Sequence, residues 1–305
     1  MNYQEADRQV DELVQQGNFE EAHILLEKMR VEFSEHTYEI TDYIVYVYLL
    51  WNRPNAAIRE LLHALERGHF YPVDQTFMKD RLGHFPEYAT LKSGSLQSKE
   101  KFQRESRSRR EIFVPAASTE KPCPVLVLLH GDGQNIDTIK ANWSPHPFVE
   151  LGYLVLYIQS SRVLKFDGYL WTGDFELARM EVKQALEDVA GEYKIDRNRL
   201  VLAGFSGGAM IALDMALRQE IPVAKCIALS PSTGEYLEQK HVGETNLNEG
   251  CITVIYGEYE SEGEAHLVVE KLKSRGVPCN VEICPGIAHA YPADIAERTK
   301  KILVD

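Results

Sequence analysis

The sequence has no hydrophobic segment long enough to cross a membrane and no recognisable export signal. Its most apolar early stretch, residues 43–51, is much shorter than the roughly 20 residues that a membrane helix needs. The first five residues are polar and acidic, unlike the basic and then apolar start of a secretory signal. We therefore expect a cytoplasmic protein that does not associate with membranes.

Closely spaced cysteines are absent as well. The five cysteines are odd in number, and no two of them form a C-x-x-C pair or another spacing typical of a metal site. Reduced and mostly buried thiols are typical of such a pattern in a cytosolic protein. The sequence therefore predicts neither a disulfide framework nor a bound metal.

Positive charge is scarce, because 33 basic residues stand against 46 acidic ones, for a net charge of −13. Since an acidic surface repels phosphate backbones, nucleic acid is a poor candidate partner. Residues 91–110 are the exception, with seven basic and two acidic side chains. We interpret residues 92–110 as a charged, solvated linker between two domains.

The composition is otherwise that of a folded globular protein. Hydrophobic residues make up 44% of the chain and charged residues 26%, which is enough apolar material for a sizeable core. The length of 305 residues suggests one large domain and a smaller one.

Residues 1–91 show the apolar spacing that is typical of helices, broken by turns at Gly17-Asn18 and Asn52-Arg53-Pro54. Ala22 and Ala57 each follow a turn and lie 35 positions apart, close to the roughly 34-residue period of a tetratricopeptide array. We expect a small all-α domain of tetratricopeptide-like hairpins, with a generic four-helix cap as the alternative. Because a stable array needs roughly three repeats, we expect these helices to pack on the next domain or to bind a protein partner.

The pattern changes in residues 111–305, where continuous apolar runs alternate with amphipathic segments. The runs at 125–129, 153–158 and 200–203 are typical of strands buried on both faces, and segment 176–193 is typical of an amphipathic helix. Strands that alternate with helices favour βαβ units. We therefore predict an α/β domain with a mostly parallel sheet and helices on both faces.

One motif in this domain indicates nucleophilic catalysis. Residues 204–208 read Gly-Phe-Ser-Gly-Gly, which fits G-x-S-x-G, and they lie between a buried strand and an apolar helix. In such a setting the serine occupies a strained turn, so the residues two positions to either side must be small. The helix amino terminus then directs its free N–H groups at the reaction centre. We predict that Ser206 is a nucleophile.

A second segment supplies candidate donors for an oxyanion. Residues 130–135 read His-Gly-Asp-Gly-Gln-Asn and directly follow a predicted strand. We expect the backbone N–H of Asp132, or that of Gly131, to bind the oxyanion together with the N–H of Gly207. His130 precedes the serine and is expected to be a structural residue beneath this loop.

These stretches, together with Gly257 to Glu260 and Gly286 to His289, resemble the α/β-hydrolase superfamily over residues 111–305. Within it they are similar to the phospholipase/carboxylesterase, dienelactone-hydrolase and feruloyl-esterase-like group. The resemblance implies hydrolysis of an ester or thioester through an acyl-enzyme intermediate, with no metal or organic cofactor. It does not extend to the amino-terminal helices.

In this superfamily the acid and then the histidine follow the serine along the chain. His289 lies in a loop after the predicted strand 280–283 and is our candidate for the base. His241 and His266 are the alternatives.

The acid should lie in the loop after the predicted strand 252–256, which reads Gly-Glu-Tyr-Glu. We predict Glu260 as the acid that orients the imidazole, with Glu258 as the alternative. The acid of the related hydrolases is usually aspartate, and here glutamate stands in its place.

The sequence as a whole predicts a serine esterase with the catalytic triad Ser206, His289 and Glu260. Trp143 and Trp171 fall on loops after early strands, where we expect them to line the substrate pocket, with ordinary packing as the alternative for each. Two other functions stay open. One is a thioesterase or peptidase on the same fold, and the other is an interaction protein whose hydrolase domain has lost activity.

Overall fold

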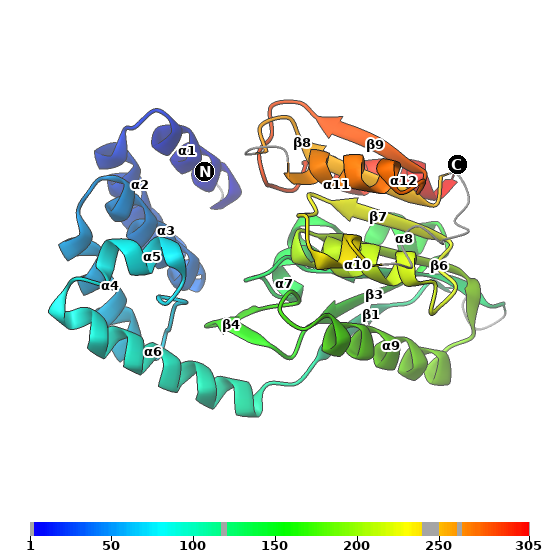
Figure 1. Ribbon diagram of the computed structural model, residues 1–305, viewed down its shortest axis with the longest axis horizontal. Helices are drawn as coiled ribbons and strands as arrows, with labels where there is room; N and C mark the ends of the chain where they lie inside the picture. Colours follow the sequence, from blue (N-terminus) through cyan, green and yellow to red (C-terminus); the bar gives the residue numbers. More distant parts are fainter. Residues whose placement is uncertain (1–2, 117–120, 240–249, 261–263, 305) are drawn as a thin grey trace. The chain divides into compact units, whose positions relative to one another are not determined.

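The structure is a computed structural model in which the chain divides into two compact units (Figure 1). The first unit comprises Met1–Glu105 and Leu164–Phe166, and the second comprises Ser106–Val163 and Asp167–Asp305. The residues that the structure describes are 3–116, 121–239, 250–260 and 264–304.

The first unit is helical, and each of its first four α-helices packs against the next one along the chain. Ala22 and Ala57, on which the repeat prediction rests, are both fully buried. Tetratricopeptide ancestry stays a prediction, because buried small residues are found in any tightly packed helical bundle. The elements are α1 (Tyr3–Gln15), α2 (Phe19–Glu32), a 3-10 turn (Ser34–His36), α3 (Thr37–Leu50), α4 (Pro54–Glu66), α5 (Thr76–Leu82) and α6 (Pro86–Glu105).

The predicted linker at residues 92–110 is wrong for most of its length, because α6 continues to Glu105 and the next strand begins at Arg109. Gly94 does not end this helix, since it packs closely against α4. An added Cβ on Gly94 would lie 2.5 Å from Leu65 Cδ2, and the neighbouring Ser95 is buried. Beyond residue 91, α6 is therefore packed through small residues, and the side chains of Lys101 and Arg104 are exposed. In the sequence this pattern is hard to distinguish from a linker.

A short excursion of the chain, Leu164–Phe166, belongs to the first unit. Phe166 packs against the buried residues of this unit, and its N–H donates to the carbonyl oxygen of Phe70 at 3.1 Å. Lys165 forms an ion pair with Asp42 at 2.8 Å. The first unit therefore includes a segment that the sequence assigned to the second.

The second unit is built on a seven-stranded sheet with the order β1-β3-β2-β6-β7-β8-β9. Neighbouring strands are parallel, except that β1 pairs antiparallel with β3. The predicted fold class is thus confirmed. The strands of the sheet are β1 (Arg109–Phe113), β2 (Cys123–Leu129), β3 (Leu154–Gln159), β6 (Ile195–Phe205), β7 (Lys225–Leu229), β8 (Ile252–Gly257) and β9 (Cys279–Cys284), and β4 (Val163–Lys165) and β5 (Gly168–Tyr169) form a separate hairpin.

Side chains of the central strands alternate between two apolar layers. Val125, Val127 and Leu129 of β2 lie in the layer with α9, α10 and α11, whereas Leu126 and Leu128 lie in the layer with α7, α8 and α12. Because both faces are covered, these strands appear in the sequence as continuous apolar runs. The helices, labelled in Figure 1, are α7 (Ile136–Asn142), α8 (His146–Glu150), α9 (Phe175–Glu192), α10 (Gly207–Arg218), α11 (Glu264–Ser274) and α12 (Ile295–Val304), with a 3-10 turn at Glu235–Leu237.

Leu202 of β6 is fully buried in one of these layers. We expect Leu202→Ala to lower the free energy of unfolding by about 2–5 kcal/mol, because it removes apolar contacts and leaves a cavity. The matched change Leu267→Ala, at a side chain that is 43% exposed on α11, should lower it by less than about 1 kcal/mol. Urea unfolding followed by circular dichroism measures both values, and equal losses would contradict the placement of Leu202 in the core.

Candidate active site

The segments predicted to be catalytic all lie at one edge of the sheet. Residues 130–135 follow β2, Ser206 follows β6, Glu260 follows β8 and His289 follows β9. These strands run parallel, so their carboxyl ends lie at the same edge. Ligands of open α/β sheets bind at this edge. The fold therefore brings together groups that lie far apart in the sequence.

Ser206 occupies a strained turn between β6 and α10. Its φ is 49° and its ψ is −116°. A residue with a side chain adopts such a positive φ at a cost of about 1–3 kcal/mol, and such residues cluster at active sites. The N–H of Ser206 donates to the carbonyl oxygen of Leu229 at 2.9 Å, which ties the turn to the neighbouring strand. This turn between a strand and a helix has the geometry that the G-x-S-x-G motif predicts for Ser206.

Close packing around this turn requires the motif's glycines. An added Cβ on Gly208 would lie 2.4 Å from the carbonyl oxygens of both Leu129 and His130. An added Cβ on Gly204 would lie 2.4 Å from the carbonyl carbon of Gly208. The helix α10 therefore begins directly against the end of β2. The N–H of Gly207, its first residue, has no partner within the helix and stays available to a ligand.

His289 connects the serine to a carboxylate. Its Nε2 lies 3.0 Å from Ser206 Oγ, and its Nδ1 lies 3.3 Å from Glu260 Oε1. The Glu260 side chain is only 7% exposed, whereas that of His289 is 47% exposed. Oε1 of Glu260 makes no hydrogen bond among the described residues, so its contact with the imidazole is that of a nearby buried charge. A buried carboxylate at this distance favours the charged imidazolium that forms when Nε2 accepts a proton.

Glu258, the alternative acid, contacts a different group. Its Oε2 accepts the N–H of Gly286 at 2.9 Å, and its own N–H donates to the carbonyl oxygen of Cys284 at 2.8 Å. The side chain of Glu258 therefore supports the loop that carries His289, and the imidazole itself is contacted by Glu260.

Among the described histidines with a candidate role, only His289 is within hydrogen-bonding distance of Ser206. His241 lies outside the described residues. His266 is 56% exposed on α11 and lies 3.0 Å from Glu270 of the same helix. The structure therefore places neither alternative beside the serine.

His130 lies fully buried beneath the loop that follows β2. Its Nδ1 is 2.8 Å from the carbonyl oxygen of Gly131, and its Nε2 accepts the N–H of Ser160 at 3.3 Å. This pattern requires a neutral ring with its hydrogen on Nδ1. Burial lowers the pKa of His130 from 6.5 to about 4, so the ring is uncharged at neutral pH.

The two candidate oxyanion donors of this loop differ in their partners. The N–H of Gly131 donates to Gln134 Oε1 at 3.0 Å, so the prediction of Gly131 as a donor is wrong for this geometry. The N–H of Asp132 has no acceptor in the part of the chain that the structure describes. Asp132 and Gly207 therefore supply the N–H groups that remain available.

The carboxylate of Asp132 has contacts that the sequence pattern did not predict. It accepts the N–H of Trp171 at 2.7 Å and the hydroxyl of Thr172. An added Cβ on Gly207 would lie 2.3 Å from Asp132 Oδ1, so the carboxylate packs directly against the start of α10. Burial raises the pKa of Asp132, and the hydrogen bonds from Thr172 and Trp171 oppose that shift. The only sequence signal for these contacts is an acidic residue in a glycine-rich turn.

The predicted role of Trp143 and Trp171 in lining a substrate pocket is wrong, because both side chains are fully buried. Trp143 Nε1 donates to Thr299 Oγ1 at 3.1 Å within the apolar layer of α7, α8 and α12. The ring of Trp171 packs against His130, with centroids 5.0 Å apart. A tryptophan in the sequence does not reveal whether its loop folds inward, and here both loops do.

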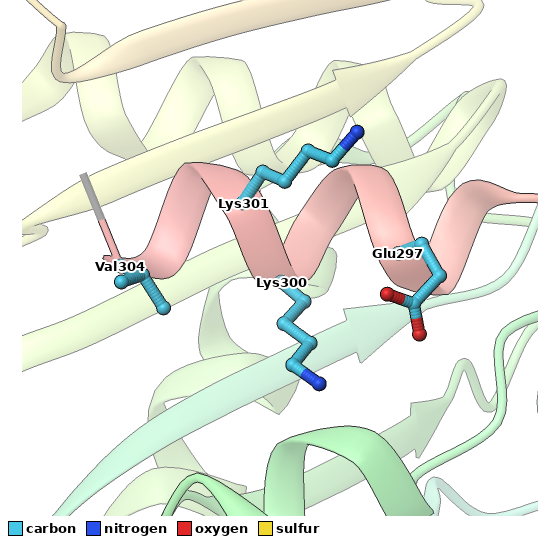
Figure 2. Close-up of a pocket in the computed structure, with 4 residues that line it drawn as sticks. All are labelled: Glu297, Lys300, Lys301 and Val304. Atoms are coloured by element: carbon cyan, nitrogen blue, oxygen red, sulfur yellow. The ribbon is translucent and has the colours of Figure 1, made fainter.

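The structure also has a pocket on α12, and none of the candidate site residues lines it (Figure 2). Its lining side chains come from this one helix and point in different directions. Binding sites usually present polar groups that converge on a ligand. This pocket therefore lacks the convergent groups of a binding site. It is lined by Glu297, Lys300, Lys301 and Val304.

No group of three or more His, Cys, Asp and Glu side chains in the described ranges is arranged to hold a metal ion. In the same ranges, no helix has the length and apolar character needed to span a membrane.

The parallel sheet, the strained serine turn and the loops at the carboxyl edge define the α/β-hydrolase fold. Residues 175–303 match the family model described as phospholipase/carboxylesterase. This match covers less than half of the chain and includes Ser206, Glu260 and His289, but it does not reach residues 130–135. It supports ester hydrolysis in general.

Several solved structures share this fold. Esterase PE8 is 21% identical, with a TM-score of 0.54, over 65% of this chain and 98% of that chain. An S-formylglutathione hydrolase from Agrobacterium tumefaciens is 17% identical, with a TM-score of 0.51, over 66% of this chain and 90% of its own. An uncharacterized protein from Bacillus cereus is 19% identical, with a TM-score of 0.52, over 99% of this chain and 97% of its own. At these identities the likeness shows the fold alone. No curated protein sequence matches the chain.

The buried, neutral His130 makes the stability of the protein depend on pH. Between its ordinary pKa of 6.5 and about 4, the unfolded chain binds a proton that the folded chain cannot accommodate. The stability is therefore complete above that range and falls as the pH falls, with a loss that approaches about 3 kcal/mol. His130→Gln has no group that binds this proton. As the pH falls through that range, we therefore expect the unfolding free energy of wild type to fall by about 3 kcal/mol relative to that of the variant.

Urea unfolding at a series of pH values measures this difference. The control is His146→Gln, at an exposed histidine of the same unit, which should keep the wild-type dependence on pH. Parallel curves for wild type and His130→Gln would contradict the neutral, buried ring.

Proposed function

We propose that this protein is a serine esterase that hydrolyses carboxylic esters through an acyl-enzyme intermediate. The observation that carries the proposal is the distance of 3.0 Å between Ser206 Oγ and His289 Nε2, at a turn where the serine has a positive φ. A nucleophile within hydrogen-bonding distance of a base, with an acid behind that base, is the arrangement that activates a hydroxyl group.

In the first half of the reaction, His289 Nε2 removes the proton of Ser206 as Oγ attacks the acyl carbon. Glu260 stabilises the imidazolium that forms, since its carboxylate lies 3.3 Å from Nδ1. The N–H groups of Asp132 and Gly207 donate to the oxyanion of the tetrahedral intermediate. His289 then gives its proton to the leaving alkoxide as the bond between the acyl carbon and the alcohol oxygen breaks.

In the second half, His289 accepts a proton from a water molecule that attacks the acyl-enzyme. The same N–H groups bind the second oxyanion, and the proton on His289 returns to Ser206 Oγ as the carboxylic acid leaves. The cycle consumes one water molecule and needs no other reactant. The phospholipase/carboxylesterase match supports esters as the substrate class. A preference for thioesters or amides, and a protein that binds without catalysis, are the alternative outcomes of the tests below.

Replacement of the nucleophile tests the proposed chemistry. We expect Ser206→Ala to lower kcat on p-nitrophenyl esters by about 10⁴–10⁶, because the acyl-enzyme cannot form. A panel of esters from acetate to palmitate, run beside a thioester and an anilide, measures the substrate class and the preferred acyl chain. A fluorophosphonate probe should label wild type and leave the variant unlabelled. Equal ester rates for the two proteins, or no labelling of the folded wild type, would rule out the serine esterase.

The two glutamates offer a matched test of the acid. Glu260→Gln removes the charge behind His289, and we expect kcat to fall by about 10²–10⁴ with little change in KM. Glu258→Gln keeps an oxygen that can accept the N–H of Gly286, so its kcat should stay within about threefold of wild type. A larger loss in Glu258→Gln than in Glu260→Gln would reverse the assignment.

A further inference from the structure

The loop that carries the oxyanion donor contains a glutamine whose side chain accepts two hydrogen bonds. Gln134 Oε1 accepts the N–H of Gly131 at 3.0 Å and the hydroxyl of Tyr291 at 2.8 Å. The backbone N–H of Gln134 donates in turn to the carbonyl oxygen of Gly131 at 3.0 Å, which closes residues 131–134 into a tight turn. The amide oxygen of Gln134 therefore links the loop after β2 to the segment that contains Tyr291.

The first of these bonds decides which backbone group of the loop is free. Because Gln134 holds the N–H of Gly131, the next N–H along the chain, that of Asp132, is the one without an acceptor among the described residues. The turn is fixed from its other side as well, because the carbonyl oxygen of Gln134 accepts the N–H of Tyr169 at 2.9 Å. An oxyanion donor must be held in place before reaction, because its contribution depends on small distances.

The second bond reaches the loop of the catalytic histidine. Tyr291 lies two residues after His289, and both rings pack on the ring of Phe205, with centroid distances of 4.2 Å for Tyr291 and 4.9 Å for His289. Burial raises the pKa of Tyr291, so its hydroxyl stays protonated and remains a donor. The hydroxyl of Tyr291, which is partly buried, has Gln134 Oε1 as its acceptor.

We propose that Gln134 is a positioning residue for this reaction, which aligns the N–H of Asp132 with the oxyanion and links the oxyanion loop to the loop of His289. The inference rests on the proposed function, because an oxyanion must form for the alignment to matter. The residue type suits the task, since an amide oxygen accepts two hydrogen bonds without placing a negative charge beside the oxyanion.

The test compares Gln134→Leu, which keeps a similar volume but removes the acceptor, with wild type. We expect kcat on p-nitrophenyl acetate to fall by about 10- to 100-fold, somewhat less than the loss of a whole oxyanion donor, with KM within about threefold. The affinity for a trifluoromethyl ketone, whose serine adduct carries the oxyanion, should fall by the same factor. Gln184→Leu, at an exposed and hydrogen-bonded glutamine of α9, should change neither quantity.

Tyr291→Phe is the second variant, because it removes one donor and leaves the glutamine in place. We expect a smaller loss of kcat than in Gln134→Leu, and the double variant should stay within about threefold of Gln134→Leu, since the two residues act through one bond. Thermal unfolding establishes that each variant is folded. If Gln134→Leu does not fold, the kcat and ketone affinity of Tyr291→Phe decide the test.

A folded Gln134→Leu with wild-type kcat and wild-type ketone affinity would overturn the inference, as would a variant that loses affinity for substrate alone. In either case an inactive Ser206→Ala would leave the proposed esterase intact. A wild-type protein that neither hydrolyses esters nor reacts with the fluorophosphonate would instead overturn the proposed function, and this inference would fail with it.

Discussion

The strained turn at Ser206 is the constraint on which the site depends. A residue with a side chain keeps a positive φ only where its surroundings hold it there, and here the backbone bond to Leu229 and the packing of α10 against the end of β2 do so. There is no space for a Cβ at Gly204 or Gly208, so a larger residue at either position would force α10 away from the sheet edge. The stability of the parallel sheet therefore maintains the strain at Ser206.

Around this turn, hydrogen-bonding side chains hold the loops that carry the candidate catalytic groups. The carboxylate of Asp132 binds the segment at Trp171 and Thr172, and Gln134 binds Gly131 and Tyr291. Glu258 likewise holds the loop of His289, because its carboxylate accepts the N–H of Gly286. Loops at the edge of a sheet are otherwise the mobile part of a domain. These hydrogen bonds hold three separate loops at the edge of the sheet where the candidate groups lie together.

The fold could be predicted because the central strands are buried on both faces, and short continuous apolar runs such as Val125 to Leu129 are typical of strands in that position. The continuation of α6 beyond residue 91 could not, because its contact with α4 is made through small residues at Gly94 and Ser95. Small residues are common in linkers, and only the neighbouring Leu65 reveals that this stretch packs as a helix. The place of residues 164–166 in the helical unit could not be predicted either. It depends on contacts with Phe70 and Asp42, which are far away in the sequence.

The sequence by itself determined the candidate nucleophile and base, because the glycines around Ser206 and the late position of His289 reflect local steric needs and chain order. Only the tertiary structure showed that Glu260 rather than Glu258 lies beside the imidazole and that the N–H of Gly131 is already bound. Only it showed that both tryptophans are buried. The reason is physical. Which of two neighbouring carboxylates or N–H groups is available depends on the direction of a side chain and on the partner already bound to it, and those partners come from other strands.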